Sequence, residues 1–213
     1  MSTQAEMGCR CREVRGIVAD VSPQSANRVI CYCDDCQAFA HHLGRADLLD
    51  PHGGSDIVQV APASLSFVQG RDRIAGLRLT PKGLYRWHST CCNTPLGNTL
   101  KPAIPFVGLF AQAFAGGAQG ADDLFGKPVG AIMGRFAIGD VPSASKRFGA
   151  ALLLGALRRV LGWRLSGKAW PHPFFDRNTG DPIYPLVVLT NAQREALRPL
   201  CGPHPAAAAS GMR

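Results

Sequence analysis

The chain has 213 residues, 46% of them hydrophobic, and carries a formal net charge of +8. This length predicts one domain with an extension and a sizeable buried core, because domains commonly have about 100 to 200 residues. Lysine and arginine are scattered, without the run of about five basic residues that marks a nucleic-acid tail. Residues 1–8 lack the apolar run of a signal peptide, which predicts a cytoplasmic protein with reduced thiols.

Cysteine is the residue type whose distribution is most informative. Seven of the eight cysteines form three clusters, which are Cys9/Cys11, Cys31/Cys33/Cys36 and Cys91/Cys92. Reduced thiols at such spacing are typical of zinc sites rather than disulfides, and a short turn over 31–36 would bring three of them onto one metal. If two Zn²⁺ ions bound the seven clustered thiolates, the net charge would fall from +8 to about +5.

The first half of the chain is predicted to be mainly β. Residues 1–7 are expected to be disordered. Six apolar segments bounded by turn residues then predict short strands, at 13–20, 27–30, 56–60, 64–68, 74–79 and 83–87. Each cysteine cluster lies next to a strand end, so a metal would join the ends of neighbouring hairpins.

The second half is predicted to be less regular. Residues 101–140 are expected to form an irregular edge, with a loop at 116–120 and a strand within 129–139, which completes a zinc-binding β domain over 8–140. Residues 141–200 form a C-terminal extension whose apolar spacing from about 143 to 165 predicts an amphipathic helix packed on the β core. Its apolar run is too short to span a bilayer. Thr190 and Gln193 predict a capping box for a last short helix before a disordered tail at 201–213.

Three ordered motifs resemble the glutathione-dependent formaldehyde-activating enzyme (GFA) family, which includes centromere protein V-like proteins. They are G-C-x-C from Gly8 to Cys11, C-x-C-x-x-C from Cys31 to Cys36, and C-N-T-P-L from Cys92 to Leu96. The resemblance covers roughly residues 8–100. It implies an Mss-four-like zinc-binding β domain, here with its own C-terminal helical extension, as in a bacterial side branch of the family.

The resemblance also implies two zinc sites with different roles. A structural zinc would be held by Cys9, Cys11 and Cys92, and a second zinc by the triplet of Cys31, Cys33 and Cys36. The chain departs from the family in having Ser89 where a cysteine is expected, an extra Cys91, and Arg12 in place of a glycine.

The missing structural ligand leaves three alternatives. Cys91 completes the first site, His88 completes it through nitrogen, or Cys91 joins the triplet. The last alternative would close the second site, since four protein ligands are typical of structural zinc and catalytic zinc keeps an open position.

Two functions follow as hypotheses. The first is a carbon–sulfur lyase-type enzyme that acts on a thiol–aldehyde adduct, with glutathione or another thiol as cosubstrate. The triplet Cys31, Cys33 and Cys36 would be catalytic. The nearest candidate proton carriers are His41, His42, Asp34 and Asp35, and the histidine pair, expected near a helix start, titrates near neutral pH, which favours His41. Arginines that could hold the carboxylates of the cosubstrate are Arg45, Arg71, Arg73, Arg78 and Arg86.

The alternative is a non-catalytic zinc module that contacts a partner, nucleic acid or an anionic surface through the basic helix around 146–164. A weaker third reading is a thiol sensor in which Cys91 and Cys92 oxidise. The isolated Cys201 is expected to be free and inert.

Overall fold

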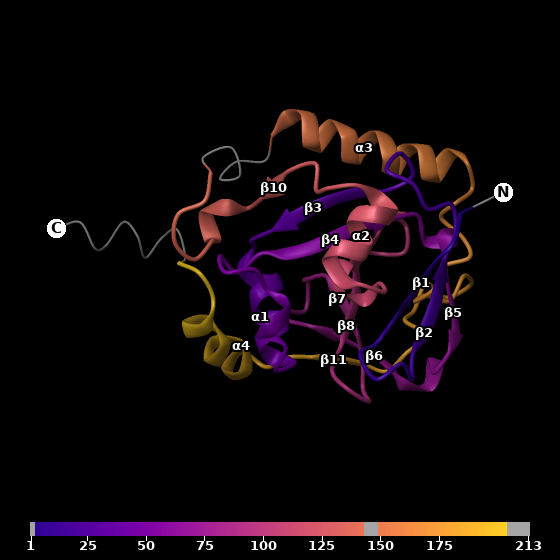
Figure 1. Cartoon of the computed structure of the whole chain (residues 1–213). Coiled ribbons are helices and arrows are strands. Elements are labelled where there is room, and N and C mark those ends of the chain that lie inside the picture. Colours follow the sequence, from indigo (N-terminus) through magenta and orange to yellow (C-terminus); the bar gives the residue numbers. More distant parts are fainter. Residues whose placement is uncertain (1–2, 143–148, 204–213) are drawn as a thin grey trace.

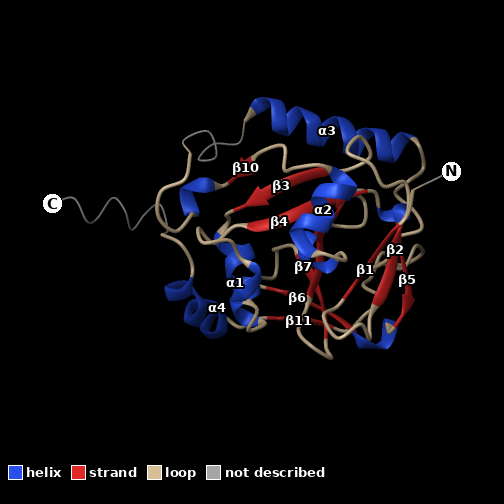
Figure 2. Ribbon diagram, in the orientation of Figure 1, coloured by secondary structure: helices blue, strands red, loops and turns tan. Residues whose placement is uncertain are grey.

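The computed structural model describes all residues except 1–2, 143–148 and 204–213. Within the described part, eleven strands form two sheets, and four α-helices lie around them, so the protein is mainly β as predicted (Figures 1 and 2). The small sheet has the order β1-β2-β5 and the large sheet the order β10-β3-β4-β9-β8-β7-β6-β11. The strands are β1 (Ala5–Gly8), β2 (Arg15–Val18), β3 (Asn27–Cys31), β4 (Ser55–Val60), β5 (Leu65–Gln69), β6 (Ile74–Arg78), β7 (Tyr85–Ser89), β8 (Pro95–Thr99), β9 (Val107–Phe110), β10 (Ala131–Ile132) and β11 (Leu186–Val188). The helices are α1 (Asp34–His42), α2 (Gly117–Phe125), α3 (Ala150–Leu165) and α4 (Asn191–Leu197).

The N-terminal segment is part of the small sheet. Residues 1–7 were expected to be disordered, but β1 begins at Ala5 and pairs antiparallel with β2. Alternate residues of β1 face the core, and Met7 is only 2% exposed. Only Ala5 and Met7 of this strand are buried, and two apolar residues in a short polar stretch are too few to predict a strand.

The large sheet is antiparallel in its centre and closed at both edges by parallel strands. Strands β3, β4, β9, β8, β7 and β6 pair antiparallel with their neighbours. At one edge β10 pairs parallel with β3, and at the other β11 pairs parallel with β6. Both edge strands come from the second half of the chain, so this half is part of the sheet.

The loop predicted at 116–120 is the start of helix α2. Gly116 precedes the helix with φ 77°, and Gly126 ends it with φ 75°, so glycines mark its boundaries rather than a loop. Ala121 and Phe125, four residues apart, face the core, and the Phe125 ring packs edge-on against Phe114 at 5.1 Å. Glycine-rich composition obscured this short apolar face. The strand expected within 129–139 is reduced to two residues in β10.

The core joins the two halves of the chain through aromatic rings. Trp87, fully buried on β7, stacks on Phe174 with ring centroids 4.6 Å apart and an interplanar angle of 6°. Phe175 packs edge-on against the same indole at 5.8 Å. Residues of the C-terminal extension therefore complete the core of the β domain.

The helices of the extension differ in how they pack. Helix α4 lies beside α1 and begins with the predicted capping box, in which Thr190 Oγ1 accepts from the Gln193 amide at 3.2 Å. Helix α3 runs along one side of the molecule (Figure 1). The prediction that Leu153, Leu154, Leu157 and Leu161 of α3 pack on the β core is wrong, because these side chains are 52% to 60% exposed. Residues 143–148 of the expected helix lie outside the described part. Among the helices that the structure describes, none has the length and apolar character needed to cross a membrane.

Candidate metal centres

The first cluster brings together four thiols from two distant loops. Cys9 and Cys11 follow β1, and Cys91 and Cys92 lie in the turn between β7 and β8. The four sulfur atoms lie within 4.8 Å of one another. The Sγ of Cys91 lies 3.7 Å from that of Cys9 and 3.3 Å from that of Cys11. Tetrahedral zinc with four thiolates needs sulfurs about 3.8 Å apart, so this cluster can hold a metal ion.

Local backbone geometry places these four thiols. After Cys9 the chain turns back, because the Arg12 amide donates to the Cys9 carbonyl at 2.9 Å. Arg12 has φ 63°, and Asn93 in the second loop has φ 52°. This left-handed region favours glycine, so Arg12 holds a backbone conformation that is uncommon for a residue with a side chain. The turn at Asn93 lets the adjacent Cys91 and Cys92 reach one site.

Ser89 lies beside the first cluster, and its hydroxyl contacts one of the thiols. Its hydroxyl accepts from the Thr94 amide at 3.0 Å and lies 3.4 Å from the Sγ of Cys92. Burial acts to raise the pKa of Cys92, but hydrogen bonds from Ser89 and Thr94 lower it to about 5. Partial burial, followed by hydrogen bonds with the neighbouring thiols, raises the pKa of Cys91 to about 12. The two adjacent cysteines thus differ strongly as acids.

The second cluster consists of Cys31, Cys33 and Cys36, which lie at the end of β3 and the start of α1. Their sulfur atoms lie within 4.8 Å of one another, with 3.4 Å between Cys31 and Cys33 and 3.9 Å between Cys31 and Cys36. The Cys33 side chain also caps α1 by accepting from the Cys36 amide at 3.3 Å. The positive end of a helix dipole stabilises thiolates at this position. Three thiols are gathered here, so the cluster can hold a metal ion with one ligand fewer than the first.

A buried arginine lies against the second cluster. The Arg86 side chain is 1% exposed, its Nη1 lies 3.6 Å from the Sγ of Cys36, and its Nη2 lies 3.8 Å from an Asp35 oxygen. Its guanidinium packs over the Phe39 ring at 5.5 Å, and its Nε and Nη2 have no hydrogen-bond partner. A buried cation is costly unless negative charge lies beside it. Hydrogen bonds from Cys31 and Cys33, and then Arg86, hold the pKa of Cys36 well below its usual range.

The structure corrects the interpretation of Arg86 as a carboxylate-binding residue. Its burial removes it from contact with a cosubstrate. Arg45, another candidate, is also buried and forms hydrogen bonds with Asp47 at 2.9 Å and with Thr94 at 3.2 Å. A single buried arginine could not be singled out among 23 basic residues from sequence alone.

The histidines lie away from both sulfur clusters. His41 and His42 were placed near a helix start, but they lie in the last turn of α1. From Cys36 to His41 the helix rises about 7.5 Å. Burial, followed by the charge of His42, lowers the pKa of His88 to about 4, and its ring packs on Phe39 at 6.4 Å. Of the three alternatives for the extra thiol, the geometry groups Cys91 with the first cluster and includes neither His88 there nor Cys91 in the triplet.

The C-terminal segment covers the second cluster, which sequence reasoning missed. Arg194 of α4 donates to Asp34 and Asp35 in the first turn of α1, both at 3.0 Å. Cys201 packs against the apolar cluster that contains Cys31 and Cys36, and its Sγ lies 3.5 Å from the Asp34 carbonyl oxygen. Cys201 is therefore half-buried beside the triplet rather than in a free tail.

A cavity of about 320 Å³ adjoins the first cluster. Cys9 lines it, together with Arg10, Arg12, Arg15 and Arg45, while Glu6 lies on the same wall and pairs with Arg15. Four thiolates around one Zn²⁺ would carry a net charge of −2. The arginines therefore offset the charge of the first cluster, and the cavity does not reach the triplet.

Two sheets with two thiol clusters define the class: a mainly β protein whose cysteines can hold metal ions. Within this class the chain belongs to the family of unknown function DUF6151, whose model matches residues 1–185. None of the curated proteins matches the chain. A crystal structure of a Rhodobacter sphaeroides protein is similar over 54% of this chain and 89% of that chain, at 14% identity and a TM-score of 0.39. The family match includes most of the C-terminal extension.

Proposed function

We propose that the protein is a cytoplasmic zinc protein in which the first cluster is structural and the triplet of Cys31, Cys33 and Cys36 acts on a thiol. The reaction is that of a carbon–sulfur lyase on the adduct of an aldehyde with glutathione or a similar thiol. The ordered motifs shared with the GFA family support this chemistry, and the same resemblance would make the β domain Mss-four-like.

The observation that carries the proposal is the pairing of three thiols with one buried arginine. Three thiolates and one Zn²⁺ sum to a charge of −1, which the positive charge of Arg86 offsets. Without a negatively charged site, Arg86 would be a buried cation with two nitrogens that lack hydrogen-bond partners. The donor set and the sulfur spacing fit zinc, and a tetrahedral ion held by three thiolates would have a fourth position for a substrate sulfur.

The residues of this site would divide the work of the reaction. Zinc, when bound, would supply the positive charge that keeps a substrate sulfur deprotonated at neutral pH. Cys31, Cys33 and Cys36 would hold it, and Arg86 would keep the sulfur of Cys36 ionised. In the cleavage direction the carbon–sulfur bond breaks, its electron pair passes to sulfur, and the hydroxyl proton leaves as the carbonyl forms. In the reverse direction sulfur attacks the carbonyl carbon and the oxygen gains a proton, with no redox change.

Two titratable side chains of α1, Asp35 and His41, are candidates for the proton carrier. Asp35 lies in the first turn of α1, but it is already engaged with Arg86 and Arg194. His41 lies on the same helix, too far along for direct contact with the triplet, so it would act through water. We therefore predict that His41→Gln slows turnover without loss of zinc.

The test is turnover by matched cysteine variants. Exchange between formaldehyde, glutathione and their adduct is followed by NMR line shape with the zinc-loaded protein. Cys33→Ser should abolish acceleration of the exchange and remove one zinc, with the fold retained. Cys201→Ser removes a neighbouring thiol outside the triplet and should leave turnover and zinc content unchanged. An unaltered rate in Cys33→Ser would overturn the proposed chemistry.

A non-catalytic zinc module is the second candidate. Helix α3 favours it, since Arg158, Arg164 and five of its leucines are exposed. X-ray absorption at the zinc edge separates the candidates. An average of less than four sulfurs per zinc, from one complete and one three-sulfur site, supports the enzyme, whereas four sulfurs at both sites supports the module.

A further inference from the structure

Helix α3 presents a stripe of leucines to solvent. Five leucines of this helix are each between 52% and 80% exposed. Their spacing of three or four residues puts them on one face. We call them the leucine stripe, which consists of Leu153, Leu154, Leu157, Leu161 and Leu165. Soluble monomers rarely expose a contiguous apolar surface of this kind, so the stripe indicates an interaction surface.

The contacts of α3 hold the leucine stripe outward. Trp163 on the opposite face is half-buried and lines a small cavity of about 80 Å³. The exposed Arg164 donates from its Nη1 to the Ala103 carbonyl at 2.8 Å while its side chain stays open to solvent, and just beyond the helix Lys168 pairs with Asp20 at 2.9 Å. These contacts fix the C-terminal end of α3 on the body of the protein. The leucines thus cannot turn inward without breaking them.

The charge around the leucine stripe is of one sign. Residues 141–175 contain six lysines and arginines and no acidic residue. With about 100° of rotation per residue, Arg158 lies at one margin of the stripe and Arg164 at the other. The surface is therefore apolar along its middle and positively charged along both sides.

This pattern selects among the surfaces that might cover α3. A second copy of the chain would bring arginine against arginine, with no acidic residue on the segment to separate them. Nucleic acid would contact the arginines through phosphate and leave the leucines in water. An anionic bilayer offers phosphates at its surface and acyl chains just below it. Only this surface matches both the stripe and its margins.

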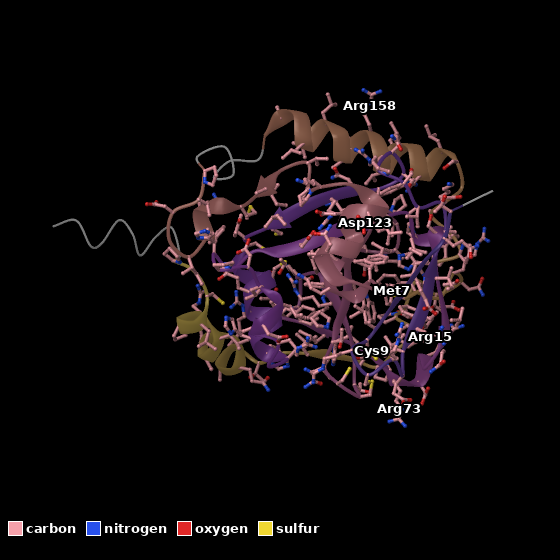
Figure 3. The ribbon with its side chains drawn as sticks, viewed as in Figure 1. Met7, Cys9, Arg15, Arg73, Asp123 and Arg158 are labelled. Carbon is pink, nitrogen blue, oxygen red and sulfur yellow. The ribbon has the colours of Figure 1, made fainter. Side chains whose placement is uncertain are left out.

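We propose that α3 lies in the headgroup layer of an anionic phospholipid membrane, with the leucine stripe toward the acyl chains and Arg158 and Arg164 on the phosphates. The helix has 16 residues and is about 24 Å long, so it lies parallel to the surface. Figure 3 places Arg158 and Cys9 at opposite edges of the molecule. The first cluster therefore faces away from the membrane. This surface acts independently of the lyase chemistry.

The experiment is co-sedimentation of the zinc-loaded full chain with vesicles. Vesicles of phosphatidylcholine alone are compared with vesicles that also contain phosphatidylglycerol, and binding is expected only to the second kind. Replacing both Leu157 and Leu161 by glutamine should weaken binding about tenfold or more. Arg158→Gln with Arg164→Gln should weaken it about tenfold and flatten its salt dependence. The matched control, Ile104→Gln with Leu200→Gln, removes exposed apolar residues elsewhere and should bind as the unchanged chain does.

Each other outcome overturns the proposal. If light scattering shows that the unchanged chain is a dimer and the leucine variant a monomer, and the unchanged chain does not bind vesicles, then a second copy covers the stripe. Equal binding to both vesicle types, or binding that neither pair of substitutions weakens, also overturns it. Thermal unfolding checks that each variant is folded. The arginine variant keeps the proposal testable if the leucine variant fails to fold.

Discussion

The two cysteine clusters use the same ligand atom in opposite surroundings. The first joins residues 82 apart in the sequence, such as Cys9 and Cys91, and Cys91 is exposed. The second takes its thiols from six consecutive residues and buries Cys36 beside Arg86. A metal that closes a long loop removes much conformational entropy from the unfolded chain, whereas one within a short turn removes little. A metal in the first cluster would thus stabilise the fold more than a metal in the second. In the second cluster the neighbouring Arg86 would instead alter the affinity for the metal.

The largest predicted effect separates the clusters by stability. Cys9→Ser should remove one zinc and cause the larger loss of stability, because this zinc would join two loops 82 residues apart in the sequence. Cys33→Ser should remove the other zinc and lower the melting temperature far less. Native mass spectrometry and circular dichroism measure both. Equal destabilisation by the two variants would contradict the comparison, and Cys201→Ser should retain two zinc ions.

The next effect concerns Arg86 alone. Arg86→Met should weaken the affinity of the triplet for zinc about 10- to 100-fold, since the charge that offsets the thiolates is lost. Arg86→Lys should recover part of it. Competition with a chromophoric chelator gives the affinity, and Arg73→Met removes an exposed arginine as control. If Arg86→Met instead weakened the affinity of the first cluster for zinc, the pairing of Arg86 with the triplet would be wrong.

A third prediction uses the contrast between adjacent thiols. The pKa of Cys92 is lowered to about 5 and that of Cys91 raised to about 12, so in metal-free protein Cys92 is the thiolate at pH 6. Iodoacetamide at pH 6 should modify Cys92 about tenfold faster than Cys201, after allowing for its lower nucleophilicity. The rate should fall as pH drops below 5, where Cys92 becomes protonated. Peptide mass spectrometry identifies the site, and faster labelling of Cys91 would refute the prediction.

The smallest effect tests the segment that covers the triplet. Thr190→Ala removes the capping box of α4 and should lower the free energy of unfolding by about 1 kcal/mol. Urea denaturation measures this change. Thr3→Ala, at an exposed threonine, is the control and should leave stability unchanged. A loss at Thr3 as large as at Thr190 would show that the cap contributes nothing particular.

The sequence predicts those parts of the protein that depend on local pattern. Clustered cysteines, alternating apolar strands and the pairing of Thr190 with Gln193 are all legible within a few residues. The grouping of Cys91 with Cys9 was one of three alternatives, because its choice depends on the left-handed turn at Asn93. Asparagine is common in this conformation, but its presence alone does not specify the turn.

Contacts between segments far apart in the chain determine the features that the sequence does not predict. Arg86 is buried because β7 carries it under Phe39 and against Cys36, and its own neighbours in sequence do not reveal this. Periodicity gave α3 an apolar face but not the direction of that face. The parallel pairing of β11 with β6 joins segments about a hundred residues apart, which apolar spacing alone cannot specify.

The two parallel strands at the ends of the large sheet also have a consequence for how the chain can be shortened. Strand β10 covers the outer backbone of β3, and β11 covers that of β6. A fragment ending near residue 115 would contain every clustered cysteine and strands β1 to β9, yet it would expose the rows of unpaired amides and carbonyls on β3 and β6. Bare edges of this kind recruit strands from other molecules. Such a fragment should therefore polymerise edge to edge, and in the whole chain β10 and β11 prevent this self-association by covering the two edges.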